Sequence, residues 1–153
     1  MEKIGPIEKI YEAWSAIADG RIEMHEDENY AWVDSSDRSK YYEVSWEDNV
    51  YGSSDSATYW QGYAGYPVLA VWMKRGKLSC LKEELLEELK GIAWKELNDK
   101  YKRDYTKAAE EALKNAAHKA EITDAAEKTY EEIKTLDISV RRGRIRHKKE
   151  NAQ

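Results

Sequence analysis

The spacing of apolar residues changes at residue 20, and this change constrains the fold more than any other feature of the chain. Before it, apolar residues share one face of a helix: Ile7, Ile10, Tyr11, Trp14, Ile17 and Ala18. From Arg21 onward, apolar and polar residues alternate, which is the period of a strand. Because Pro6 and Gly20 bound the first segment, the sequence predicts a helix over residues 5–19 and strands after it.

Residues 21–52 predict an antiparallel meander of three or four strands. The strand signals are Ile22 and Met24, the apolar run 31–33, the alternating Tyr42, Val44 and Trp46, and the short pair Val50 and Tyr51. Polar residues 34–39 and the pair 48–49 are typical of the connecting turns. The opposite face carries Glu23, Tyr41, Glu43 and Ser45. We therefore expect one side of this sheet to meet water or a partner.

The second half of the chain predicts helices. Pro67 and Gly76 bound a short apolar segment, residues 67–76, that favours a helix over a strand. A helical region over residues 79–136 follows, with Ser79 as its cap, and its apolar residues repeat every four positions: Leu81, Leu85, Leu89, Ala93, Leu97, Tyr101 and Tyr105. Such a stripe rotates by about 40° per step around a helix. The helix must therefore contact several neighbours or break near residues 98–104.

A last helical segment, capped by Thr123 or Asp124, is expected to end near Leu136. Together these segments predict an α+β fold, with one domain over residues 1–137 and a flexible basic tail over residues 138–153. At 153 residues the chain is long enough for one core and too short for two large domains.

Composition and charge restrict the partners and the compartment that we expect for the protein. The net charge is −5, but the residues from Arg141 onward carry +5 and the rest of the chain −10. Any contact with nucleic acid should therefore use the tail. Cys80 is the single cysteine, which excludes an internal disulfide, and no apolar run is long enough to cross a membrane. We expect a cytoplasmic protein that makes no membrane contact. Its high content of Lys and Glu is also a composition that proteins from hot environments show.

An aromatic loop over residues 59–67 is the first candidate binding surface. It combines rings, glycines and an amide side chain, and its candidate contact residues are Tyr59, Trp60, Gln61, Tyr63 and Tyr66. Rings of this kind serve as stacking or sugar-binding platforms because they are large, rigid and polar at the edge. Their alternative role is structural, in which they hold the sheet edge against the long helical region and pack on Trp72 and Trp94, which are nearby in sequence. The sequence favours the structural role and leaves both open.

The basic tail is the second candidate surface. Its cations are Arg141, Arg142, Arg144, Arg146, Lys148 and Lys149. An extended arm of this kind can follow a phosphate backbone, with affinity that falls as salt rises. The alternative is a solvated end without a partner, and the sequence does not separate the two.

Other clusters carry weaker signals. Residues 53–58 are rich in hydroxyls but lack the glycines and lysine of a phosphate loop, so an ordinary turn is favoured. Glu23 and His25 share a strand face, where charged residues commonly protect a sheet edge. Cys80 matches no cysteine-enzyme pattern, and the pair His118 and Glu121 lacks the second pair that a metal-binding bundle requires. We predict no catalytic residue, no cofactor and no metal.

The sequence favours a non-enzymatic binding or adaptor protein that contacts a protein or nucleic acid through the aromatic loop and the tail. The alternative is a small-molecule-binding domain or small enzyme, with a pocket between sheet and helices that uses Trp60, Tyr63, Asp55 and His25. A third hypothesis is a homodimer formed through the C-terminal helices, because the rotating Leu and Ala stripes leave surfaces unused.

Overall fold

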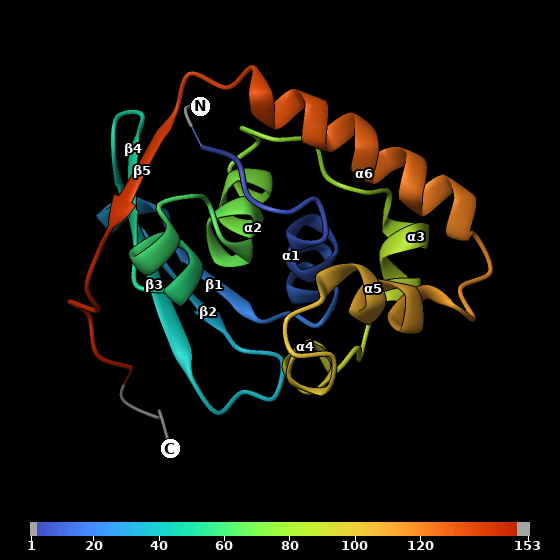
Figure 1. Cartoon of the computed structure of the whole chain (residues 1–153). Helices are drawn as coiled ribbons and strands as arrows, with labels where there is room; N and C mark the ends of the chain where they lie inside the picture. The colour runs from blue at the N-terminus through green and yellow to red at the C-terminus, as the bar shows by residue number, and fades with distance from the viewer. Residues whose placement is uncertain (1–2, 150–153) are drawn as a thin grey trace.

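The computed structural model describes residues 3–149, in which one five-stranded sheet carries helices on one of its faces (Figure 1). The strands are β1 (Ile22–His25), β2 (Tyr30–Asp34), β3 (Tyr41–Glu47), β4 (Val50–Ser53) and β5 (Ser139–Arg142). The first four strands form the predicted antiparallel meander, and β5 lies parallel to β4 at the edge. The α+β class is confirmed.

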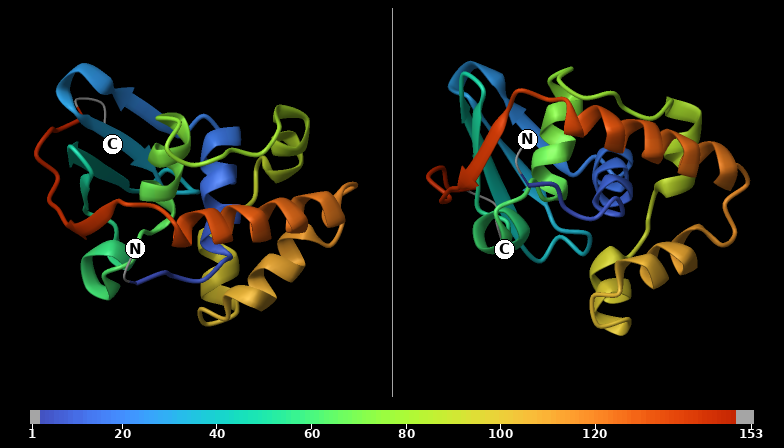
Figure 2. Two further views of the ribbon diagram at one scale, coloured as in Figure 1. Left: turned by 90° about the horizontal axis from the view of Figure 1, so that it is seen from above. Right: turned by 45° about the horizontal axis from the view of Figure 1, so that its top comes forward.

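The helices surround a central first helix. They are α1 (Lys9–Ala18), α2 (Tyr66–Lys74), α3 (Glu83–Leu86), α4 (Trp94–Lys100), α5 (Tyr105–Leu113) and α6 (Lys119–Lys134). Three short helical turns are η1 (Glu26–Glu28), the π-helical η2 (Ala57–Gln61) and η3 (Glu87–Leu89). Helix α2 separates α1 from the sheet, and the later helices cover the other side of α1 (Figure 1, Figure 2). As a result, α1 is buried on nearly every side.

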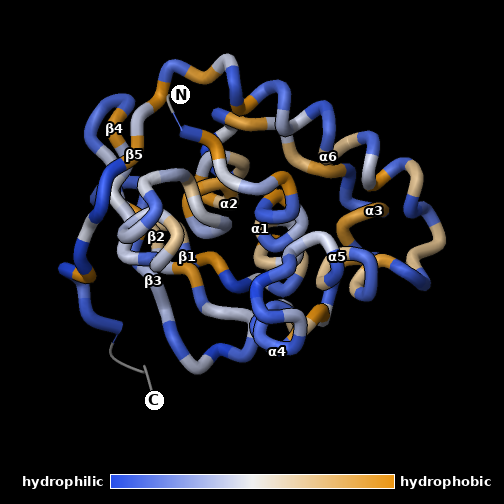
Figure 3. Tube along the Cα trace, in the orientation of Figure 1, coloured by the Kyte–Doolittle hydropathy of each residue, from blue (hydrophilic) through white to orange (hydrophobic). Residues whose placement is uncertain are grey.

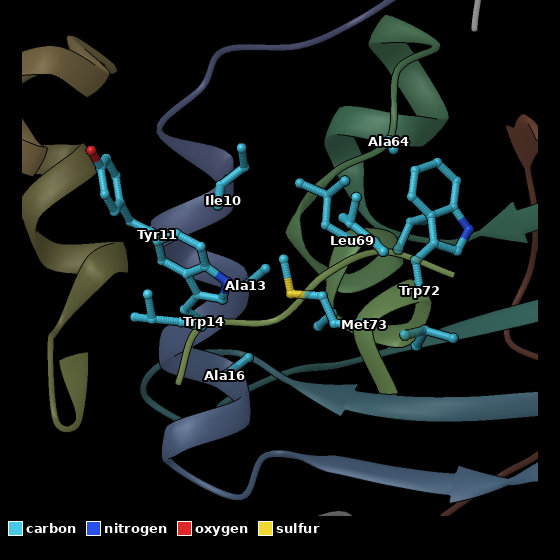
Figure 4. Close-up of a cluster of buried hydrophobic side chains, with 14 of the residues drawn as sticks. Ile10, Tyr11, Ala13, Trp14, Ala16, Ala64, Leu69, Trp72 and Met73 are labelled. Carbon is cyan, nitrogen blue, oxygen red and sulfur yellow. The ribbon is translucent and has the colours of Figure 1, made fainter. Parts of the chain in front are cut away.

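The core lies between α1, α2 and the sheet. Ile10 and Ala13 of α1 point toward Leu69 and Met73 of α2, whereas Tyr11 projects away from α2 (Figure 4). Hydropathy along the chain agrees with this arrangement, because apolar segments gather around α1 and α2 while the outer helix α6 alternates between apolar and polar residues (Figure 3). Each inner helix therefore contributes apolar surface to more than one neighbour.

The positions of prolines and glycines explain most of the boundaries of α1 and α2. The first helix begins at Lys9 rather than at residue 5, since the Pro6 carbonyl accepts only a turn-type bond, at 3.1 Å, from the Lys9 N–H. Gly20 ends the segment with φ +66°, a conformation that favours glycine. The predicted second helix is α2, with Pro67 in its first turn and Gly76 just after its end at φ +72°.

The helical region over residues 79–136 is broken, as the rotating stripe indicates. One break lies at residues 90–93 and another between Lys100 and Tyr105. The predicted cap at Ser79 is wrong, because α3 begins only at Glu83. Thr123 and Asp124 lie inside α6 and do not cap it.

The start of α6 is fixed from outside the helix. Glu88 accepts hydrogen bonds from the backbone N–H of His118, at 2.9 Å, and pairs with its ring at 2.6 Å. His118 is the residue before the helix, so this long-range contact sets the boundary that the local capping signals at Thr123 and Asp124 place five or six residues too late.

Much of the predicted flexible tail is held against the sheet. Ser139–Arg142 forms β5, and the Gly143 N–H donates to the Ser53 carbonyl at 2.8 Å. A Cβ on Gly143 would meet the Ser53 nitrogen at 2.9 Å, so the close approach requires glycine. Residues 150–153 of the predicted tail lie outside the described residues. For residues 139–149, the expectation of a flexible extension is corrected.

The surfaces that suggested a homodimer are partly used within the chain. The buried members of the Leu and Ala stripes are Leu81, Leu85, Leu89, Ala108, Ala109 and Leu113. Ala93, Ala117 and Ala120 are exposed. Within residues 3–149, no helix combines the length and apolar character that crossing a bilayer demands. Self-association through the C-terminal helices stays a prediction.

Two tryptophans test this description of the core. Trp72 is fully buried, whereas Trp60 is 71% exposed. We expect Trp72→Ala to lower the free energy of unfolding by about 3–5 kcal/mol, because it removes a large buried side chain. Urea denaturation followed by circular dichroism measures the change. Trp60→Ala is the matched control and should change it by less than about 0.5 kcal/mol. Equal losses in both variants would contradict the assigned burial.

Candidate functional site

A polar cleft of about 890 Å³ opens between α1, β3, the aromatic loop and α4. Its wall includes two groups of side chains that the sequence separates widely. The charged and amide side chains are Lys9, Glu12, Arg21, Lys40, Gln61, Lys95, Asn98, Asp99 and Arg103. The aromatic side chains are Tyr42, Trp60, Tyr63, Tyr66, Trp94 and Tyr105. This volume lies within the range of small-molecule sites.

Buried charges form the floor of the cleft. Glu12 is 4% exposed and Arg21 is 3% exposed. The Lys9 ammonium, also buried, lies 3.3 Å from Glu12 Oε2 and 4.2 Å from the centroid of the Tyr105 ring. Arg21 donates to the Asp34 carbonyl at 2.8 Å and to the Asp19 carboxylate at 3.2 Å. Charged groups are rarely buried to this extent without a specific role.

Two buried polar atoms at this floor, Arg21 Nη2 and Asn98 Oδ1, have no hydrogen-bond partner among residues 3–149. Glu12 Oε2 makes no hydrogen bond of good geometry there either, but it is paired with the Lys9 ammonium at 3.3 Å. The other such side-chain atoms in the described chain are indole nitrogens of core tryptophans. Buried polar groups are normally satisfied, so one acceptor and one donor left over in one wall indicate a site that a polar ligand can complete.

The protonation states follow from burial. Burial raises the pKa of Glu12, and the nearby Lys9, Asn98 and Arg21 offset that rise only in part. Burial by itself would lower the pKa of Lys9, but the interactions of the ammonium with Glu12, Tyr105 and Tyr63 together outweigh this effect and the pKa is raised. Burial also raises the pKa of Tyr66, which remains a neutral phenol. Glu12 can therefore accept a proton more readily than an exposed carboxylate.

The aromatic loop divides between two surfaces. Trp60, Gln61, Tyr63 and Tyr66 line the cleft. Tyr59 points elsewhere, with its ring centroid 4.9 Å from the guanidinium carbon of Arg142 on β5. Tyr63 packs on the backbone of Gly5, where a Cβ would meet the Tyr63 ring at 2.3 Å. The loop is thus both a structural support and a cleft wall, so its two roles are not exclusive.

A hydroxyl and carboxylate network holds this loop in place. Asp55 accepts hydrogen bonds from the Ser53 hydroxyl and from the Thr58 N–H, the latter at 3.1 Å. The Thr58 hydroxyl in turn accepts from the Gly65 N–H at 3.1 Å. A Cβ on Gly65 would meet Asp55 Oδ2 at 2.0 Å. Residues 53–58 therefore form a turn around a buried carboxylate, as the sequence favours, and Asp55 does not line the cleft.

The remaining weak candidates lie apart from the cleft. His25 pairs with Glu23 at 2.6 Å and stacks on Tyr30. Cys80 is exposed, but partial burial raises the pKa of its thiol, which disfavours the reactive thiolate. No group of three carboxylate, imidazole or thiol side chains in the described part of the chain is placed to hold a metal ion.

The basic extension, residues 139–149, begins in the sheet as β5, and its last residues contact Trp32, Asp34 and Glu43 of β2 and β3. Glu43 is 1% exposed and accepts from the His147 N–H at 2.8 Å and the Arg146 N–H at 3.2 Å. The Trp32 indole donates to the His147 carbonyl at 3.0 Å, and Lys149 pairs with Asp34 at 3.1 Å. The exposed cations are Arg141, Arg142, Arg144, Arg146 and Lys148.

Sequence reasoning missed the floor of the cleft. Lys9, Glu12 and Ser15 are three residues apart on α1, a spacing that places polar groups on one side of a helix. The other sides of α1 are apolar, so this polar stripe was the available signal. Arg21 and Asn98 come from distant segments and carry no comparable signal.

The chain belongs to the family described as Uncharacterised conserved protein UCP014422, which matches residues 2–139. No curated protein and no solved structure matches the chain. The matched range contains all the cleft residues and ends at the first residue of β5.

The raised pKa of Glu12 predicts a distinct dependence of stability on pH. The folded state binds a proton at Glu12 more tightly than the unfolded state, in which the pKa of Glu12 is near 4.5. The protonated Glu12 therefore contributes fully to stability below pH 4.5, and this contribution is lost as pH rises through the pKa of the folded state. We expect the stability of the wild type relative to Glu12→Gln to fall between these two pKa values. Urea denaturation at successive pH values measures it.

Glu8→Gln is the control, since Glu8 lies one turn earlier and outside the cleft. This variant should keep the wild-type pH dependence. A constant difference between wild type and Glu12→Gln across the interval would contradict the burial of an ionisable Glu12.

Proposed function

For this member of the family, we propose a small-molecule-binding function centred on the cleft between α1, β3 and α4. The observation that carries the proposal is the pair of unpartnered buried atoms, Arg21 Nη2 and Asn98 Oδ1, in one cleft wall beside the buried ion pair of Lys9 and Glu12. A ligand with both a donor and an acceptor would satisfy both atoms. Leaving such groups unpaired is costly, so their pairing is a source of both affinity and specificity.

The aromatic wall supports the same proposal. Tyr42 and Tyr66 meet edge to face with centroids 6.4 Å apart, and Arg21 lies 5.8 Å from the Tyr66 centroid. Small-molecule sites typically combine such apolar and aromatic surface with a few directed polar groups. Of the residues that the sequence assigns to a pocket, Trp60 and Tyr63 lie here, whereas Asp55 and His25 do not.

A thermal-shift screen with a library of small polar compounds tests this function. A ligand present at 100 times its dissociation constant should raise Tm by about 5–10 °C in a chain of this size. We expect Asn98→Ala to reduce the shift, because it removes one of the floor acceptors. Asn115→Ala, at an exposed position outside the cleft, should keep it. The proposal fails if no compound shifts Tm, or if both variants retain the full shift.

A second candidate function is nucleic-acid binding by the basic extension. Five of its cations are exposed, although the backbone is held at β5 by pairing with β4 and at residues 146–147 by Glu43 and Trp32. Ordered cations lose less conformational freedom on binding phosphates than cations on a free tail. Because the remainder of the chain is net acidic, a polyanion is expected to contact this basic segment.

Fluorescence anisotropy with a labelled single-stranded oligonucleotide at several salt concentrations tests this candidate. Replacing Arg141, Arg144 and Arg146 together by Gln should weaken binding and reduce the salt slope by about 2. The control replaces the exposed residues Lys114, Lys119 and Lys128 by Gln, which removes the same charge from the helical side. Equal effects of both triple variants would mean that binding depends only on the net charge of the protein. That result would contradict a binding surface on the basic extension.

A further inference from the structure

The charge of the cleft is opposite to that of the chain. Its lining includes five cations, namely Lys9, Arg21, Lys40, Lys95 and Arg103, and two carboxylates, Glu12 and Asp99. The cleft is thus net positive in a chain of net charge −5. Clefts lined by one sign of charge concentrate ligands of the other sign. An anionic ligand is therefore favoured.

Burial separates these charges into two levels. Lys9, Glu12 and Arg21 are buried at the floor, whereas Lys40, Lys95 and Arg103 are exposed at the rim. Lys95 has one carboxylate neighbour, Asp37 at 3.7 Å, in an exposed pair that is weak in water. A ligand anion at the floor would face the Glu12 carboxylate. The rim offers cations, so the anionic group belongs there.

The floor instead fits the edge of a neutral polar group. Asn98 Oδ1 is an acceptor and Arg21 Nη2 a donor without hydrogen-bond partners among residues 3–149. The Glu12 carboxylate beside them has Lys9 as its ion-pair partner at 3.3 Å. Such a mixed set suits a ring edge that carries both N–H donors and lone-pair acceptors, as nucleobases do. Carboxylate and amide side chains read base edges in this way.

Aromatic rings line the same cleft as these charges. Tyr42, Tyr63 and Tyr66 line the wall, and the Trp60 indole is 71% exposed. Isolated exposed tryptophans cost solubility without adding to the core, but they provide stacking surface for a planar ligand. A flat ring between the floor and the rim would contact these side chains.

The backbone at the rim is held in an uncommon conformation. Lys102 and Arg103 are consecutive residues with φ +51° and +68°, between α4 and α5. The left-handed region is unfavourable for side chains with a Cβ, and such residues gather at functional sites. Of the two, Arg103 lines the cleft and Lys102 does not.

From these observations we infer that the cleft binds a nucleoside phosphate. The base edge pairs with Glu12, Arg21 and Asn98, the rings of the aromatic loop contact the base, and Lys40, Lys95 and Arg103 hold the phosphate. This inference rests on the proposed small-molecule function and names its ligand class. It requires no chemical step.

Isothermal titration calorimetry with the four ribonucleoside monophosphates, their nucleosides and ribose 5-phosphate tests the inference. At least one nucleotide should bind, and its nucleoside and ribose 5-phosphate should each bind at least about tenfold more weakly, because each lacks one set of contacts. Arg103→Asn should weaken nucleotide binding by about tenfold and leave nucleoside binding unchanged.

Lys102→Asn is the matched control. It removes the same charge from the neighbouring residue with the same backbone conformation, and asparagine tolerates positive φ at both positions. This variant should bind nucleotides as the wild type does. An equal loss in both variants would overturn the role of Arg103.

The outcomes separate this inference from the function on which it rests. Nucleosides that bind as tightly as nucleotides would overturn the phosphate site at the rim. Absence of nucleotide binding, together with a library compound whose thermal shift depends on Asn98, would overturn the nucleoside phosphate class and leave the small-molecule function standing. Absence of any ligand in both experiments would overturn both.

Discussion

The hydroxyl of Ser15 joins the two halves of the molecule, and the candidate cleft depends on this junction. Ser15 Oγ donates to the Leu89 carbonyl at 2.7 Å and accepts from the Trp94 indole at 2.8 Å. Both bonds are buried, where leaving either partner unpaired would be costly. They fix α1 against both ends of the connection that leads into α4. Asn98 lies one turn beyond Trp94, so this anchor also sets where Asn98 meets the cleft.

Helix α1 is buried on nearly every side, so it contributes both to the apolar core and to the floor of the cleft. Its apolar positions pack against α2 and the C-terminal helices, while Lys9 and Glu12 lie on the remaining side, at the cleft floor. The attraction between a buried carboxylate and a buried ammonium offsets only part of the hydration energy that both groups lose. The unpartnered Arg21 Nη2 beside the buried pair of Lys9 and Glu12 shows that this part of the core is not optimised for stability alone. Such local compromises are typical of sites whose polar groups serve a ligand.

The sequence predicted those parts of the fold that local signals specify. The meander and α2 follow from strict alternation and from a proline and a glycine at the two ends of one segment. Strand β5 was missed because it has four residues, of which Val140 alone is apolar. Its position depends on Gly143 and on Glu43, which lies about a hundred residues earlier. The cleft was missed for the same reason, since its floor combines side chains from three distant segments.

The aromatic loop links the two surfaces of the protein. Within the π-helical turn η2, Tyr59 and Trp60 are neighbours whose rings meet at 4.7 Å, yet Tyr59 contacts Arg142 of β5 and Trp60 lines the cleft. π-Helical turns are rare and gather at functional sites. The network of Ser53, Asp55 and Thr58 anchors this turn to β4, the strand that pairs with β5. A shift of the turn would therefore move both the cleft mouth and the support beneath the basic extension, which gives the two surfaces a shared structural element.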